Sequence, residues 1–261
     1  MTEFLRDIVN FQNCPITDKT YIQQCATKLR SDSILTLESF LFTDVVEELV
    51  REAEQQKDEA FFTSSTHNVY LTEKDDSLGI NHVFNRQVRS SKGCITTDQV
   101  IKSSKLHKLY RSDDFKAFIA AIVGEDSLFE YGDTLSGINV HYAADKQELG
   151  WHFDNSSFAI TLLLQRPFEG GVFEYVRDLR DAESGDMKFD AVENVLDGKT
   201  PVQKININPG TLVLFRGRDS MHRVTPVSGS ITRIMVVLAY NNKPNIPLSE
   251  TARMTFFGRL V

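Results

Sequence analysis

Two histidines and one aspartate in the second half of the chain have the types and spacing of a metal centre. His152 and Asp154 form an H-x-D pair, and His222 follows later in the sequence. On extended backbone, residues i and i+2 point to the same side, so His152 and Asp154 can share one ion. Two imidazoles and one carboxylate form the facial triad of non-haem Fe(II), which leaves coordination positions open for other ligands.

An arginine eleven residues after His222 extends this pattern. A 2-oxoacid can occupy two of the open positions on such an iron, and O₂ can occupy the third. If the oxoacid carries a second carboxylate, that carboxylate needs a cation, and a guanidinium binds it through two hydrogen bonds. Arg233 lies on the last strong strand-like run of the chain. The order of the four residues therefore predicts an iron centre that uses a dicarboxylic 2-oxoacid.

Several longer motifs surround these residues, and together they resemble a known family. The motifs are Gly170-Gly-Val-Phe-Glu-Tyr, Asn208-Pro-Gly-Thr-Leu-Val-Leu-Phe and His222-Arg-Val-Thr-Pro-Val. Over roughly residues 137–240 the chain resembles the Fe(II)/2-oxoglutarate-dependent dioxygenases of the prolyl-hydroxylase-like type. More narrowly, Leu149-Gly-Trp-His-Phe-Asp-Asn-Ser-Ser-Phe-Ala-Ile-Thr is similar to the branch of stand-alone halogenases and hydroxylases of free amino acids.

The resemblance implies a role for individual residues. It implies His152, Asp154 and His222 as iron ligands, Arg233 as the clamp for 2-oxoglutarate, and Tyr142 as a contact of that cosubstrate. The implied cofactors are Fe(II), 2-oxoglutarate as cosubstrate, and O₂. The candidate substrate contacts are Arg89, Asn155 and His141, with Arg86 beside Arg89 in a polar segment.

Not every position matches that branch. Leu149 and Phe256-Phe257 are apolar and do not match its lysine-binding polar set, which leaves a substrate other than lysine open.

The elements that must position these residues fall into two halves. Helical periodicity is present over 18–29, over 44–56 and after Asp113, whereas residues 66–90 are polar with a short strand-like piece at 69–71. Strand-like runs follow at 137–142, 158–165, 171–176, 211–215 and 231–240. We expect an α+β protein, a double-stranded β-helix or jelly roll with a mainly helical N-terminal half packed on it.

Residues 1–261 are interpreted as one dioxygenase domain. About 1–130 would give helical support, and about 131–261 would form the jelly-roll core with an insertion at 177–204. In that insertion, Phe189, Val192, Val195 and Leu196 allow a short helix.

Composition narrows the class of partner. The 261 residues carry a net charge of −7 spread along the chain, which argues against binding to nucleic acid or an anionic membrane. No apolar run is long enough to span a membrane, and the first residues do not resemble a secretory signal. Three cysteines without C-x-x-C spacing favour free thiols in the reducing cytoplasm. The expected partner is a small molecule, and the oligomeric state stays open, a homodimer included.

These observations favour hydroxylation of an unactivated C–H bond in a small polar metabolite, a free amino acid or derivative, with release of succinate and CO₂. A carboxylate at Asp154 fills the position that halide occupies in the halogenases of the branch, so we expect oxygenation and no chlorination. Three alternatives remain: hydroxylation of a peptide or protein side chain, desaturation or cyclisation by the same iron chemistry, and a metal-binding module without enzymatic activity.

Overall fold

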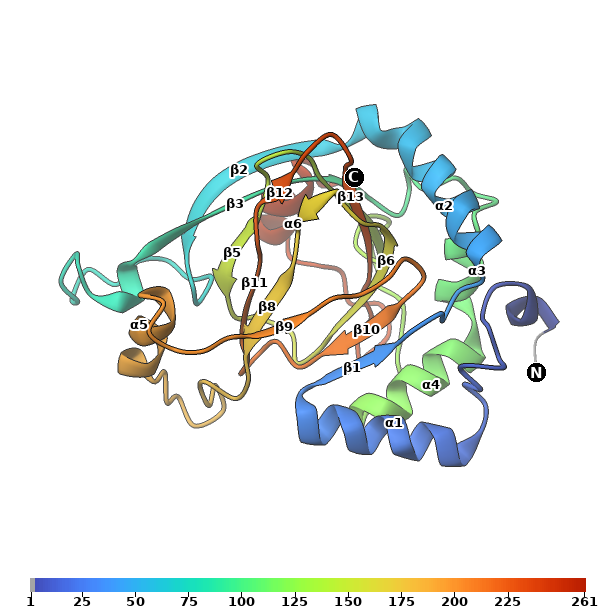
Figure 1. Ribbon diagram of the computed structural model, residues 1–261, viewed down its shortest axis with the longest axis horizontal. Helices are drawn as coiled ribbons and strands as arrows, with labels where there is room; N and C mark the ends of the chain where they lie inside the picture. The colour runs from blue at the N-terminus through green and yellow to red at the C-terminus, as the bar shows by residue number, and fades with distance from the viewer. Residues whose placement is uncertain (1–2) are drawn as a thin grey trace.

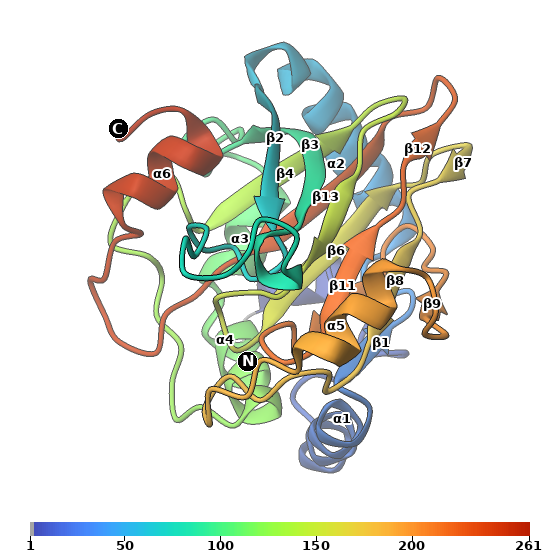
Figure 2. The ribbon, with the colours of Figure 1, turned by 90° about the vertical axis from the view of Figure 1, so that its left-hand side faces the viewer.

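The computed structural model describes residues 3–261, with side chains from Leu5 onward. Its centre is a curled antiparallel sheet of eleven strands in the order β1-β10-β6-β13-β4-β3-β5-β11-β8-β9, with β2 paired to β3. Helices α1 to α4 lie together along one side of the sheet, and α6 lies on another (Figures 1 and 2). The arrangement confirms the expected jelly roll with helices packed on it. No helix in residues 3–261 is long and apolar enough to cross a membrane.

The three expected helices are present in the first half. They are α1 (Lys19–Asp32), α2 (Thr43–Gln56) and α4 (Asp113–Val123), and a further helix, α3 (Lys105–Arg111), precedes α4. The Asp18 side chain accepts a hydrogen bond from the Tyr21 N–H and so caps α1. On α2, the side chains at helical spacing are buried against the sheet: Val45, Val46, Leu49 and Ala53.

The first half also supplies strands to the sheet, which the sequence interpretation missed. These strands are β1 (Ile34–Leu37), β2 (Phe61–Asn68) and β3 (Gln87–Ile95). The expected strand piece at 69–71 is wrong, because the strand ends at Asn68 and a turn follows. β2 and β3 are largely polar, so periodicity did not reveal them, but they pair along their whole length from Phe61–Cys94 to Asn68–Gln87.

Five strands of the second half match the expected runs: β4 (Ile138–Ala143), β6 (Ala159–Gln165), β8 (Phe173–Val176), β10 (Leu212–Phe215) and β13 (Arg233–Leu238). The remaining strands are short: β5 (Leu149–His152), β7 (Glu169–Gly170), β9 (Gln203–Ile205), β11 (Met221–Val224) and β12 (Val227–Ser228). The 177–204 segment holds the expected helix, α5 (Phe189–Leu196), and α6 (Glu250–Phe257) lies near the C-terminus.

Alternation along the strands separates the two faces of the sheet. On β4, the side chains of Ile138, Val140 and Tyr142 belong to the main hydrophobic core beneath the helices. Asn139 and His141 point to the opposite face and line a cavity. One face of the sheet therefore supports the fold, and the other carries the polar groups.

Candidate metal centre and its cavity

Two neighbouring strands bring the predicted histidines together. His152 ends β5 and pairs directly with His222 of β11 in the antiparallel ladder. Their ring centroids lie 4.2 Å apart. Asp154 follows β5 in a loop, where its backbone N–H donates to the Gly217 carbonyl at 3.0 Å. His222 does not lie on the strand that follows Asn208, because β10 stops at Phe215 and a turn through Gly217 leads into β11.

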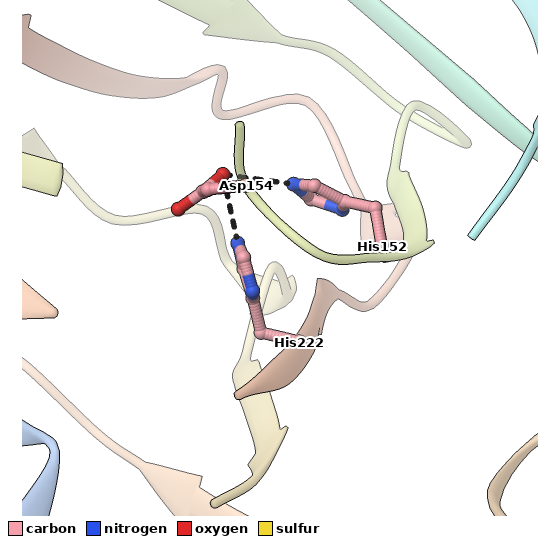
Figure 3. A group of neighbouring side chains, drawn as sticks. All are labelled: His152, Asp154 and His222. Atoms are coloured by element: carbon pink, nitrogen blue, oxygen red, sulfur yellow. Dashed lines mark ion pairs between the residues drawn. The ribbon is translucent and has the colours of Figure 1, made fainter. Parts of the chain in front are cut away.

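The ligand atoms of the three residues converge on one point (Figure 3). The Asp154 Oδ1 atom lies 3.7 Å from His152 Nε2 and 3.5 Å from His222 Nε2. Ligand atoms of all three residues lie within 4.8 Å of one another, so the group could hold a metal ion.

The backbone sets which ring nitrogen is available. The Nδ1 atoms of His152 and His222 lie 2.8 Å and 3.1 Å from the carbonyls of Gly150 and Ser220. When each Nδ1 donates to its carbonyl, each Nε2 is left as an acceptor facing Asp154. The same contact, from a histidine to the residue two positions earlier, orients both rings for metal binding.

The surroundings of Asp154 also fit a cation. Its Oδ2 atom is buried and has no hydrogen-bond partner among the described residues. A Cβ at Gly217 would lie 1.9 Å from Asp154 Oδ2, so only glycine leaves room for this carboxylate. A buried anionic oxygen without a partner is costly, and a metal ion would compensate that cost.

The charge states of these groups suit metal binding. Burial lowers the pKa of His152, and the neighbouring His222 lowers it further, so the imidazole is neutral and free to ligate. Burial would raise the pKa of Asp154, but the nearby His222, His152 and Lys92 outweigh burial, and the net shift is downward. Two imidazoles and an ionised carboxylate are the donor set that iron(II) oxygenases use.

The three residues line a cavity of about 340 Å³ that also contains Arg233, the first residue of β13. The Arg233 side chain is only 8% exposed, and burial lowers its pKa to about 10, which keeps it charged at neutral pH. Among residues 5–261, no carboxylate forms an ion pair with it. A Cβ at Gly171 would lie 2.9 Å from Arg233 Cδ, so this glycine makes room for the arginine stem. An unpaired buried guanidinium of this kind is suited to an anionic ligand.

The other predicted site residues are distributed unevenly. His141 lines the cavity, as expected for a substrate contact. Tyr142 does not, because it lies on the opposite face of β4 and donates its hydroxyl to the Ala53 carbonyl at 2.7 Å. The expected contact between Tyr142 and the cosubstrate is therefore not supported by its position.

Three polar candidates also lie away from the cavity. Arg89 is exposed on β3, and Asn155 is exposed in the loop after Asp154. Arg86 forms an ion pair with Asp197 and donates to the Leu196 carbonyl, so it fastens the end of α5. None of the three lines the cavity, and the interpretation of Arg89 and Asn155 as substrate contacts is not supported by this arrangement.

The sequence interpretation missed polar groups that do line the cavity, chiefly Lys92 on β3, Asn139 on β4 and Ser136 before it. Lys92 is separated from Arg89 by three positions, which on a strand places the two side chains on opposite faces. If residues 87–95 are recognised as a strand, the sequence does indicate Lys92, because Ser90, Lys92 and Cys94 then share one face and Arg89 lies on the other.

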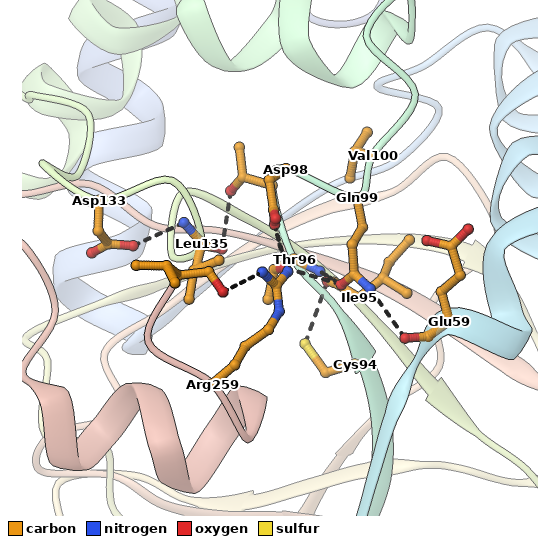
Figure 4. A network of polar contacts seen from close by, with 12 residues as sticks. Glu59, Cys94, Ile95, Thr96, Asp98, Gln99, Val100, Asp133, Leu135 and Arg259 are labelled. Atoms are coloured by element: carbon orange, nitrogen blue, oxygen red, sulfur yellow. Dashed lines mark hydrogen bonds and ion pairs between the residues drawn. The ribbon is translucent and has the colours of Figure 1, made fainter.

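The C-terminal segment covers part of the cavity with Leu248, Phe256 and Phe257. A polar network fixes this segment to the loops that follow β3 and precede β4 (Figure 4). Arg259 donates to Thr96 Oγ1 at 2.6 Å and to Asp98 Oδ1 at 2.7 Å. Asp133 Oδ2 accepts from the Leu248 N–H at 2.8 Å. These contacts hold apolar side chains over the polar centre.

Solved structures share this arrangement of strands. The epimerase SnoN from nogalamycin biosynthesis has a TM-score of 0.58 at 14% identity over 85% of this chain and 84% of its own. An oxidoreductase of the 2OG-Fe(II) oxygenase family from Burkholderia pseudomallei has a TM-score of 0.52 at 14% identity, over 85% and 91%. A Pseudomonas putida prolyl-4-hydroxylase has a TM-score of 0.51 at 13% identity, over 83% and 98%. The fold is thus that of the Fe(II)/2-oxoglutarate oxygenases.

The sequence comparison gives a narrower assignment. Residues 17–255 match the model of the family described as Halogenase D, and the chain belongs to that family. No curated protein matches the chain in sequence.

Proposed function

We propose that this protein is an Fe(II)/2-oxoglutarate-dependent oxygenase that hydroxylates an unactivated C–H bond of a free amino acid or a similar small metabolite. The observation that carries this proposal is the combination, in one cavity, of the His152–Asp154–His222 group and the unpaired Arg233 guanidinium. A structure of SnoN, which has the same fold, contains Fe³⁺ and α-ketoglutarate, and this supports the same pair of ligands here.

The residues of this site have different roles. His152, Asp154 and His222 hold the metal, and Arg233 binds the distal carboxylate of 2-oxoglutarate and fixes its direction. When bound, the iron with 2-oxoglutarate and O₂ supplies oxidation of a C–H bond, with succinate and CO₂ as by-products. The apolar side chains around the centre exclude water from the reaction.

Asp154 favours oxygenation over halogenation, although the family is described as a halogenase family. Its carboxylate is positioned beside both imidazoles, where it fills a coordination position and repels an anion. Halide binding would need that position to be vacant. The retained aspartate therefore supports a hydroxylase within this family.

The shape of the cavity favours a small molecule over a peptide. Its volume of about 340 Å³ is within the usual range for small-molecule sites. The C-terminal segment lies over it, whereas a peptide substrate would need an open groove.

The test is a reaction of the wild-type protein with Fe(II), 2-oxoglutarate and a panel of amino acids, in high chloride and under isotopically labelled O₂. We expect substrate-dependent succinate and a product that contains one labelled oxygen and no chlorine. A chlorinated product would overturn the role of Asp154 as a ligand. An unsaturated or cyclised product without new oxygen would replace hydroxylation by desaturation or cyclisation. Absence of succinate with every substrate, and of 2-oxoglutarate binding, would reduce the protein to a metal-binding module.

The Asp154→Gly variant provides a second arm of the same experiment. Removal of the carboxylate opens a coordination position for chloride, but the neighbouring residues still orient substrate for oxygen transfer. We expect a large loss of rate, and any chlorinated product should appear only in this variant.

A further inference from the structure

The cavity contains a second cation, Lys92, that the metal and cosubstrate do not require. Lys92 comes one residue before Gly93, which pairs with Tyr142 across β3 and β4. Its side chain therefore shares a face with Cys94 and His141, toward the cavity. Its Nζ atom lies 3.1 Å from His141 Nε2 and donates to this ring.

Among the residues that the structure describes, Lys92 has no anionic partner of its own. Among residues 5–261 no carboxylate forms an ion pair with it, and its contact at hydrogen-bond distance is the His141 ring. Burial, with Lys92 and Arg233 nearby, lowers the pKa of His141 well below its usual value, so this ring accepts without adding charge. Lys92 is half-buried, and an ammonium removed in part from water and held only by a neutral acceptor is incompletely compensated, which is the situation expected of a binding site for an anion.

The charges in the cavity leave room for one more anion. Of the described residues that line it, Asp154 is the only acid, whereas Arg233 and Lys92 are both cations. Fe(II) and 2-oxoglutarate cancel each other in formal charge, so the loaded cavity keeps one excess positive charge. Lys92 and Arg233 lie on the two strands that flank β4, so their backbones are roughly 10 Å apart. When Arg233 binds the distal carboxylate of the cosubstrate, Lys92 on the other side of β4 is left for another ligand.

The side chains that line the rest of the cavity indicate the chemistry of the remaining part of that ligand. Its lining beyond the polar groups is apolar and includes Leu71, Leu149, Met235, Val237, Leu248 and Phe257. Nothing in this lining can neutralise a positively charged side chain. Two further acceptors of the lining lie away from Lys92, because the register places Lys92 level with the last residue of β4. They are the Ser136 Oγ atom, which is buried without a partner among the described residues, and the Asn139 Oδ1 atom, since Asn139 uses only its Nδ2 atom in hydrogen bonds. They are neutral and add no negative charge to the cavity.

We propose that Lys92, positioned by His141, binds the α-carboxylate of the primary substrate, and that this substrate is an amino acid with an apolar, uncharged side chain. This inference rests on the proposed oxygenase function and adds the class of substrate to it. A basic amino acid such as lysine would place its side-chain charge against an apolar wall, at a high cost in desolvation.

The experiment measures binding by calorimetry to protein loaded with Zn(II) and 2-oxoglutarate, which does not turn over. The probes are L-leucine, L-leucinamide and L-lysine. For wild-type protein we expect leucine to bind more tightly than the other two. Lys92→Met should weaken leucine binding ten- to hundredfold, the value of a charged hydrogen bond, and should leave leucinamide nearly unchanged. Lys92→Arg should restore much of the loss. Lys74→Met, at an exposed lysine paired with Asp76, is the matched control.

Each other outcome overturns the inference. If Lys92→Met weakens the binding of 2-oxoglutarate instead of the binding of leucine, Lys92 belongs to the cosubstrate site. If lysine binds wild-type protein as tightly as leucine, the substrate class is wrong. If no amino acid binds while 2-oxoglutarate still does, the inference fails and the proposed function stands. If wild-type protein binds no 2-oxoglutarate and forms no succinate with Fe(II), both fail. His141→Gln provides a second variant, because glutamine keeps an acceptor beside Lys92. It should weaken leucine binding less than Lys92→Met does.

Discussion

The two ends of the cavity are built in different ways. The metal end takes its ligands from one tripeptide, His152-Phe153-Asp154, and from the strand that pairs with it. The substrate end is assembled from β3, from β4 with the residues before it, and from the C-terminal segment, which are far apart in the sequence. A metal site can therefore be encoded locally in the sequence, whereas the groups that select a substrate depend on how distant segments meet.

This difference explains how much the sequence could predict. The H-x-D pair is determined by the two-residue period of a strand, and the antiparallel pairing of β5 and β11 adds His222. Of the expected substrate contacts, His141 lines the cavity, but Arg89 and Asn155 are exposed. Lys92, which was not expected, also lines the cavity. The two-residue period of a strand places Lys92 and Arg89 on opposite faces of β3. The sequence could not indicate this, because the polar composition of β2 and β3 concealed both strands.

The largest effect is expected on metal binding, from a substitution at the metal end of the cavity. In Gly217→Ala, the new Cβ would lie 1.9 Å from Asp154 Oδ2 and must displace this carboxylate. We expect metal affinity to fall roughly 100-fold, as it does when groups that orient a ligand are removed, and activity to fall with it. Bound metal after dialysis, measured by mass spectrometry, checks this result.

The control for that variant is Gly79→Ala, because nothing lies within 4 Å of a Cβ at Gly79. It should keep wild-type metal content. Since Gly217 does not have a positive φ, its alanine variant tests space around Asp154 and not backbone strain. Full metal binding by Gly217→Ala would show that Asp154 is not held where a ligand must be.

A smaller effect is expected at Arg233, where one ligand contact is lost and the metal site stays intact. Arg233→Ala removes the only arginine among the described residues that line the cavity, and it should weaken 2-oxoglutarate binding about ten- to hundredfold. Metal content should not change, and the affinity of the Zn(II)-loaded protein for 2-oxoglutarate, measured by calorimetry, is the test. Arg166→Ala, at an exposed arginine that contacts Asn208, is the control. An unchanged affinity for 2-oxoglutarate in Arg233→Ala would place the cosubstrate clamp elsewhere.

The smallest effect is expected from a substitution on the core face of β4, which should change stability but not ligand binding. Tyr142 packs in the core and donates its hydroxyl to the Ala53 carbonyl of α2, whereas His141, the adjacent residue, faces the cavity. Tyr142→Phe keeps the ring but leaves the Ala53 carbonyl without its donor, so the free energy of unfolding should fall by about 1 kcal/mol. Chemical denaturation with unchanged m-value measures this loss. The affinity for 2-oxoglutarate should stay at the wild-type value, because the phenol does not reach the cavity. A weaker affinity for 2-oxoglutarate in Tyr142→Phe, without loss of stability, would restore the role that the family resemblance implied for this tyrosine and would contradict the separation of the two faces.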